Sequence, residues 1–288
     1  DLIVGTAADT VGRLAKGAAL QVLRVNSGAT ALEWGAPASL RSYLAGFNMS
    51  TAGASTTMSI SAGQCADSTN VSSMSLGAFS KTTSAWALGS AAGGLDTGSI
   101  GASTWYHFFV IQRPDTGVVD ALISLSATAP TLPTNYTLFR RIGSGKTNGS
   151  SQWTSFTQDG DYFVWAASVL DVSANNPGTT AVQRTLTVPP GLNVLAHFQG
   201  ILRNTDTSTI TSAYFSDTAQ DNEVPSNTDF CDLGATRDSA GSVITDASRF
   251  FIRTNTTSEI RSRLTFSSAS VTLYIRTLGW YDTRGRNL

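Results

Sequence analysis

The two histidines, His107 and His197, are the side chains best suited to proton transfer near neutral pH. Each lies in an apolar run, Trp105–Ile111 or Val194–Phe198, of the kind that forms a buried strand. A Ser-His-Asp triad also needs a presented nucleophile, and the chain has no Gly-x-Ser-x-Gly sequence that would supply one. We therefore interpret both histidines as core or interface residues, and we predict no catalytic residue and no enzyme activity.

Carboxylate pairs offer the main enzymatic alternative, because glycoside hydrolysis needs only two carboxyl groups about 5–10 Å apart. Most aspartates stand in turn sequences such as Asp115-Thr-Gly and Asp159-Gly, where the side chain caps its own backbone. Asp159 and Asp161 also have the spacing of a weak calcium pair. A turn is the favoured interpretation there, so we predict no metal and no cofactor, and polysaccharide depolymerase activity stays an open alternative.

Two short patterns have structural interpretations. Ser144–Thr147 is similar to the end of a phosphate-binding loop, but the glycine that such a loop requires is replaced by Arg140. We interpret it as a hairpin turn. Cys65 and Cys231 are far apart in the sequence and could pair, although two buried free thiols are the favoured interpretation.

Composition excludes several partners. Charged residues make up 14% of the chain, against roughly 25% in typical soluble domains, and the net charge is −1. Nucleic-acid binding needs a concentrated basic surface, so we predict no nucleic-acid partner. The sequence has no apolar run of the roughly 18 residues or more that indicate a membrane-spanning helix, so we predict no membrane insertion.

The body of the chain, residues 47–288, has the alternation of β-strands. Apolar and polar residues alternate in Thr57–Ala62, Thr185–Val188 and Val271–Ile275. Trp105–Ile111 is apolar on both faces, which predicts a central strand covered on both sides. Turn clusters separate these runs, so we predict an all-β fold with a jelly-roll-like β-sandwich body. A break at 171–180 either divides this body or forms a long loop within one sandwich.

The first 46 residues differ from the body, because they consist of short apolar pieces separated by turn residues. Each piece is too short to bury a core alone, so we expect this segment to intertwine with copies of itself or to dock on a partner. Residues 37–46 have Pro37 at the start, Gly46 at the end and Leu40, Tyr43 and Leu44 on one helical face. They predict a short helical joint.

Two arginines are candidate ligand-binding residues. If Ile260–Phe266 and Val271–Thr277 form a hairpin, Arg261 lies opposite Arg276. Like charges in that position are destabilising by roughly 0.2–1 kcal/mol. A carboxylate from the same or a neighbouring subunit would compensate, and so would an anionic group of a bound glycan or of a partner protein.

Two aromatic residues are candidates for stacking on a sugar. Trp153 and Tyr214 lie beside loop sequence, where an exposed ring could cover the apolar face of a saccharide. The structural alternative is that both rings belong to the core.

Several segments resemble virion fibre proteins of tailed phages. In the N-terminal part they are Asp1–Gly17, Gln21–Asn26 and Leu32–Gly35. In the body they are Gly93–Gly98, Thr104–His107, Leu132–Gly143, Phe156–Phe163 and Leu278–Arg286.

The resemblance implies a virion appendage, usually a homotrimer, whose N-terminal segment binds other virion proteins. It further implies attachment to the host surface, for instance to a glycan, through several weak sites whose combined avidity is high. A purely structural collar, head-fibre or decoration protein is the alternative from a different functional class.

Overall fold

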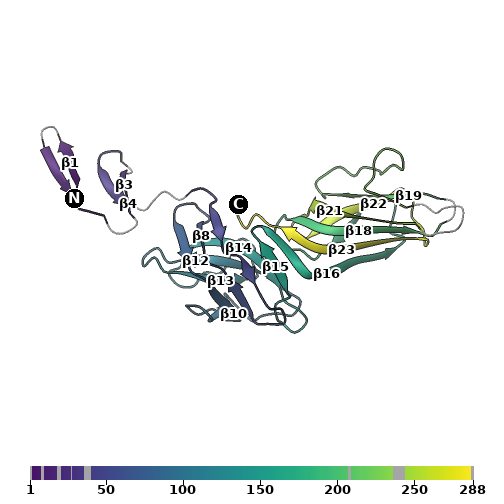
Figure 1. Cartoon of the computed structure of the whole chain (residues 1–288), viewed down its shortest axis with the longest axis horizontal. Helices are drawn as coiled ribbons and strands as arrows, with labels where there is room; N and C mark the ends of the chain where they lie inside the picture. The colour runs from purple at the N-terminus through teal and green to yellow at the C-terminus, as the bar shows by residue number, and fades with distance from the viewer. Residues whose placement is uncertain are drawn as a thin grey trace.

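The computed structural model describes residues 2–7, 10–17, 21–26, 28–35, 40–206, 209–235 and 244–286. Throughout these ranges the regular structure is β-strand and contains no helix, which confirms the predicted all-β fold. Figure 1 shows two N-terminal hairpins followed by two strand-rich lobes. In the described residues, no helix could cross a membrane.

The N-terminal hairpins pair β1 (Leu2–Ala7) with β2 (Thr10–Leu14), and β3 (Val22–Val25) with β4 (Leu32–Gly35). The second hairpin is joined to the first through Trp34, whose Nε1 donates a hydrogen bond of 2.6 Å to the carbonyl of Ala15. The second hairpin exposes four apolar residues, Val22, Leu23, Val25 and Leu32.

The predicted helical joint is wrong where the structure can test it. Residues 36–39 lie outside the described residues, and the chain from residue 40 onward makes a turn and then strand β5 (Leu44–Gly46). Leu44 is buried opposite Cys65. Strand pairing therefore prevails over the local helical spacing, because it buries Leu44 and satisfies the backbone together.

The first lobe packs a seven-stranded sheet beside a three-stranded one. The order in the larger sheet is β14 (Leu138–Lys146), β12 (Trp105–Gln112), β13 (Val119–Ser124), β11 (Gly93–Leu95), β10 (Phe79–Ala85), β7 (Thr57–Ile60) and β6 (Met49–Ser50). The smaller sheet is β5, β8 (Gly63–Ala66) and β9 (Ser73–Leu76).

Strand β12 lies between β13 and β14 and is covered on both faces, as predicted. Phe108 and Val110 face the main core, whereas Phe109 and Ile111 face a smaller cluster around Tyr136. The predicted turn at Ser144–Thr147 is wrong, because Ser144 to Lys146 continue strand β14 opposite β12.

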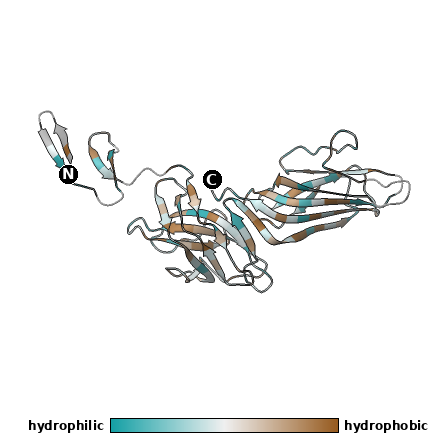
Figure 2. Cartoon of the chain, in the orientation of Figure 1, coloured by the Kyte–Doolittle hydropathy of each residue, from teal (hydrophilic) through white to brown (hydrophobic). Residues whose placement is uncertain are grey.

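The second lobe is a sandwich of two sheets. One has the order β15 (Phe156–Asp159), β16 (Tyr162–Asn175), β23 (Val271–Tyr281), β18 (Leu195–Asn204) and β21 (Ile244–Arg253). The other has the order β17 (Val182–Thr185), β22 (Glu259–Leu264), β19 (Thr211–Ser216) and β20 (Leu233–Ala235). Figure 2 shows hydrophobic and hydrophilic residues interspersed along these strands, as sheets with one buried face require.

Residues 171–175 form the end of the long strand β16, and residues 176–181 connect it to β17. The chain passes from the first lobe to the second between β14 and β15, because β15 is the edge strand of the second-lobe sheet. The chain returns after β23, because residues 282–286 pack back into the first lobe.

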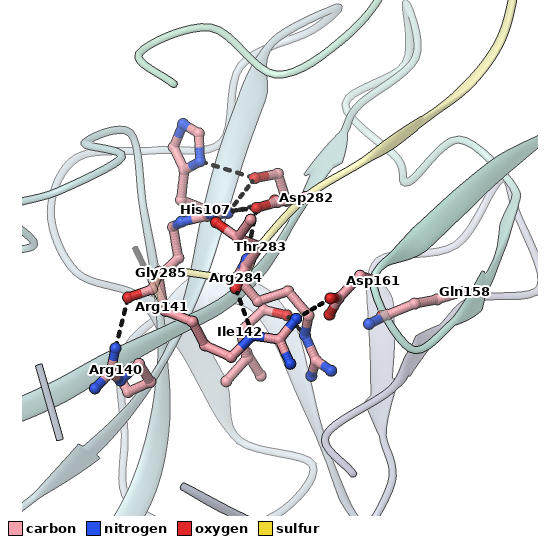
Figure 3. Close-up of polar contacts among 12 residues, drawn as sticks. His107, Arg140, Arg141, Ile142, Gln158, Asp161, Asp282, Thr283, Arg284 and Gly285 are labelled. Atoms are coloured by element: carbon pink, nitrogen blue, oxygen red, sulfur yellow. Dashed lines mark hydrogen bonds and ion pairs between the residues drawn. The ribbon is translucent and has the colours of Figure 1, made fainter. Parts of the chain in front are cut away.

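This returning segment, which we call the C-terminal strap (residues 282–286), is held by buried polar contacts (Figure 3). Arg141 donates two hydrogen bonds to the carboxylate of Asp282, one of them 2.6 Å long. Arg284 donates to the carbonyl oxygens of Ile142 and Phe47, each at 2.7 Å. Trp105 of the first lobe also packs edge-on against Trp280, with ring centroids 5.4 Å apart.

Candidate functional site

Trp153 cannot be a sugar-stacking residue, so that prediction is wrong. Its side chain is fully buried, and its Nε1 donates a 3.2 Å hydrogen bond to the carbonyl of Thr56. The ring packs against Tyr106 and Phe108 in the first-lobe core. A ring without exposed surface has no face to offer a ligand.

The predicted hairpin between Ile260–Phe266 and Val271–Thr277 is also wrong. Strand β22 lies in the four-stranded sheet between β17 and β19, whereas β23 lies in the five-stranded sheet. Arg261 is therefore opposite Gln183 and Ser216, and not opposite Arg276. The like-charge conflict that suggested an anionic ligand for this pair does not arise.

Arg261 and Tyr214 instead hold a loop of their own chain, residues 217–230. Arg261 donates hydrogen bonds of 2.7 and 2.9 Å to the carbonyl oxygens of Thr218 and Gln220. Tyr214 is half-buried and packs against Phe230, with ring centroids 4.4 Å apart. Both side chains are occupied in supporting this loop.

Arg261→Ala should loosen the 217–230 loop, because charge-assisted hydrogen bonds to its backbone are lost. We expect the free energy of unfolding to fall by about 1–2 kcal/mol and limited proteolysis in the loop to become faster. Arg276→Ala is the matched control, since among the described residues Arg276 makes one hydrogen bond, of 3.5 Å, to Ser168. Equal protease resistance of the two variants would contradict this role of Arg261.

Arg276 lies on a different surface, the outward face of β21, β18, β23 and β16, which we call the outer face. The strand registers place its residues in five rows across the sheet. In the strand order β21, β18, β23, β16, these rows are Arg253–Leu195–Tyr281–Tyr162, Phe251–His197–Gly279–Val164, Arg249–Gln199–Arg276–Leu170, Ala247–Ile201–Tyr274–Ser173 and Thr245–Arg203–Thr272–Asn175.

The first two rows bring four rings together, Tyr162, His197, Phe251 and Tyr281, which we call the aromatic platform. Tyr162 stacks on Tyr281 at 4.3 Å between centroids, and His197 stacks on Phe251 at 4.4 Å. Phe251 is 50% exposed and Tyr281 40% exposed. Large aromatic surfaces left open on neighbouring strands are typical of a binding site.

Hydrogen bonding fixes the platform. The hydroxyl of Tyr162 and Nδ1 of His197 form a hydrogen bond of 2.5 Å. Burial lowers the pKa of His197, and the nearby Arg249 lowers it further, so the imidazole is neutral at pH 7. The platform therefore holds uncharged rings in a fixed arrangement, in which His197 is buried while Phe251 and Tyr281 are exposed.

A cleft of about 720 Å³ adjoins the platform at the junction of the lobes and shares Leu195, Arg253 and Tyr281 with it. Its two carboxylates are both bound to arginines: Asp161 to Arg286, and Asp282 to Arg141. Burial alone would raise the pKa of Asp282, but Arg141 and the Arg284 amide hold it below its ordinary value. An ionised, arginine-bound carboxylate is a poor proton donor.

His107, Ser144 and Asp282 also come close together, yet they belong to the lobe junction. Nδ1 of His107 lies 2.9 Å from Oγ of Ser144, and all three side chains are at most 2% exposed. Burial lowers the pKa of His107 to about 3, with Arg141 contributing. The imidazole is therefore neutral and enclosed, as the interpretation of His107 as a core residue requires.

Both cysteines are free thiols. Cys65 is buried, as expected, whereas Cys231 is exposed, so the expectation of two buried thiols holds for Cys65 only. Among the residues that the structure describes, no group of His, Cys, Asp and Glu side chains is arranged to hold a metal ion. Asp159 and Asp161 flank the turn at Gly160, as interpreted from the sequence.

No family model matches this chain, and no curated protein matches it either. The geometry of the outer face therefore bears on function directly. Sequence reasoning named Arg276 as a ligand-binding candidate and His197 as a core or interface residue, but it proposed none of the four platform rings for binding. The available signal was the alternation in Arg249-Phe-Phe-Ile-Arg253, which places Phe251 on the same side of the strand as two arginines.

Proposed function

We propose that this protein is a virion fibre or spike protein of a tailed phage that attaches to the host surface by binding saccharide through the aromatic platform. The observation that carries the proposal is the stacked, half-exposed pair Tyr162 and Tyr281 beside the exposed ring of Phe251. The apolar face of a sugar ring packs on such aromatic surfaces. The resemblance of the N-terminal and body segments to phage fibre proteins supports the virion assignment.

The N-terminal hairpins support the second part of the proposal, attachment to other virion proteins and association as a homotrimer. Val22, Leu23 and Val25 are exposed on a short two-stranded ribbon, which is marginally stable alone. Contact with a neighbouring chain would bury these side chains. Three copies would then present three platforms, and weak sites would combine into firm attachment.

The test is binding of the full chain to whole bacterial cells and to a panel of immobilised cell-surface polysaccharides. Tyr281→Ala should weaken binding about fivefold per site, because an aromatic contact contributes about 1 kcal/mol. Tyr43→Ala is the matched control, since Tyr43 is an exposed tyrosine of the first lobe, 37% accessible. Unchanged binding by Tyr281→Ala would refute the role of the platform.

The same experiment separates the alternatives. A collar, head-fibre or decoration protein would bind no cell and would associate with capsid or tail protein through its N-terminal hairpins. A depolymerase would release oligosaccharide from the polysaccharide that it binds, which a reducing-end assay detects.

A further inference from the structure

The charges that the four strands place on the outer face are all of one sign, whereas the neighbouring edge strand β15 places Asp159 opposite Tyr162. The five rows of the outer face contain Arg203, Arg249, Arg253 and Arg276 and no aspartate or glutamate. Arg253 is neutralised by Asp217, at 2.6 Å between Nε and Oδ2. Within the described part of the chain, Arg203 and Arg249 have no hydrogen bond or ion pair, and Arg276 has only its long contact with Ser168.

Two of these free cations lie beside the aromatic platform. Arg249, Gln199 and Arg276 are directly opposite one another on β21, β18 and β23. This row is two residues along the strand from the row of Phe251 and His197, a distance of about 7 Å. The two arginine Cα atoms are separated by two strand spacings, or about 10 Å.

We propose that the outer face binds an acidic saccharide, a sugar chain that carries carboxylate, sulfate or phosphate groups. The platform covers a sugar ring, while Arg249 and Arg276 bind the anionic group and the Gln199 amide lies between them for a hydroxyl or carboxylate oxygen. This inference rests on the proposed saccharide binding and adds the charge class of the ligand.

Charge complementarity favours this occupant over a second copy of the chain. A two-fold contact between two outer faces would bring arginines against arginines and leave them without partners. Nucleic acid is also anionic, but the chain has a net charge of −1, and within the described residues this face has three arginines without an ion pair. Binding to phosphate backbones requires many more cations.

The experiment compares polymers that differ only in charge. Polygalacturonate is paired with its fully methyl-esterified form, and dextran sulfate is paired with dextran, each against the full chain by biolayer interferometry. The expected result is that at least one acidic polymer binds at least tenfold more tightly than its neutral partner, and that added NaCl weakens this binding.

Two arginine substitutions test whether the tighter binding of the acidic polymer comes from the outer face. Arg249→Gln and Arg276→Gln should each weaken binding of the acidic polymer about tenfold, because each removes a charge-assisted hydrogen bond. Binding of the neutral polymer should be unchanged. Arg113→Gln is the matched control, since Arg113 is a partly exposed arginine of the first lobe paired with Asp115.

The outcomes are distinguishable. Equal binding of neutral and acidic polymers, with sensitivity to Tyr281→Ala, would overturn the charge inference and leave the proposed function standing. Binding to no saccharide and to no cell would refute the proposed function itself. Tight binding of a single-stranded oligonucleotide, or a changed oligomeric mass of Arg249→Gln, would overturn the saccharide assignment in favour of a nucleic-acid site or of a contact between copies.

Discussion

Asp282→Asn should lower the free energy of unfolding by about 3–5 kcal/mol, the effect expected when one partner of a buried ion pair is removed. Arg141 and Asp282 are 3% and 2% exposed, so the remaining guanidinium would be left charged in an interior without a counterion. The amide of Arg284 would also exchange a charged acceptor for a neutral one. Urea unfolding followed by tryptophan fluorescence measures the difference.

Two further variants test this interpretation. Replacing both partners, as in Arg141→Met with Asp282→Leu, should restore part of the lost stability, because no charge then remains buried. Asp115→Asn breaks an exposed arginine–aspartate pair and should change stability little. A similar small effect for Asp282→Asn would show that the strap does not depend on this ion pair.

The free energy of unfolding should fall steeply in mild acid because of His107. Its folded-state pKa of about 3 lies below its ordinary value of 6.5, so the unfolded chain takes up a proton first. The stabilisation is complete above pH 6.5 and is lost as the pH falls from 6.5 to about 3. The slope contributed by one such group approaches about 1.4 kcal/mol per pH unit.

Urea unfolding at a series of pH values across this window measures the slope. His107→Gln should flatten most of it, since glutamine does not titrate and retains polar atoms that can pair with Ser144. The pKa of His197 is also lowered, but this side chain is less buried than His107. The His107→Gln variant should therefore keep a smaller dependence of stability on pH, which comes from His197. Asp282 adds to the loss only below its ordinary pKa of 3.8. An identical slope in wild type and His107→Gln would contradict the assignment.

The strand content of this protein was predictable from local pattern. The doubly apolar run Trp105–Ile111 became the central strand β12, and the alternation at Val271–Ile275 became β23. Both patterns reflect which faces of one strand are covered, and that information is contained in the strand itself.

Strand pairing was not predictable, because it depends on residues far away in sequence. One core contains the apolar residues of both strands, Ile260, Leu264, Leu273 and Ile275. Their alternation fits a hairpin, and it fits equally well two strands in separate sheets that face each other across the core. The structure has the second arrangement. The helical joint failed for a related reason: a helix and a short paired strand can both bury Leu44, and only the partner strand β8 decides between them.

The candidate site could not be predicted from the sequence, because it too depends on strand pairing between distant residues. Tyr162, His197, Phe251 and Tyr281 come from four strands and become neighbours only through the register of β16, β23, β18 and β21. Trp153, by contrast, lies beside a loop in sequence but is enclosed by bridges to Ser55 and Thr147. Proximity to a loop therefore did not indicate exposure.

The C-terminal strap has a mechanical consequence. Tension between the N-terminal hairpins and the outer face would pass from lobe to lobe along two stretches of chain, the segment from β14 to β15 and the strap that begins at Asp282. The second stretch ends in hydrogen bonds from Arg141 and Arg284, which resist sliding of the strap past the first lobe. Because the load is divided, neither lobe can swing or peel away by extension of a single linker, and the outer face keeps its orientation under drag.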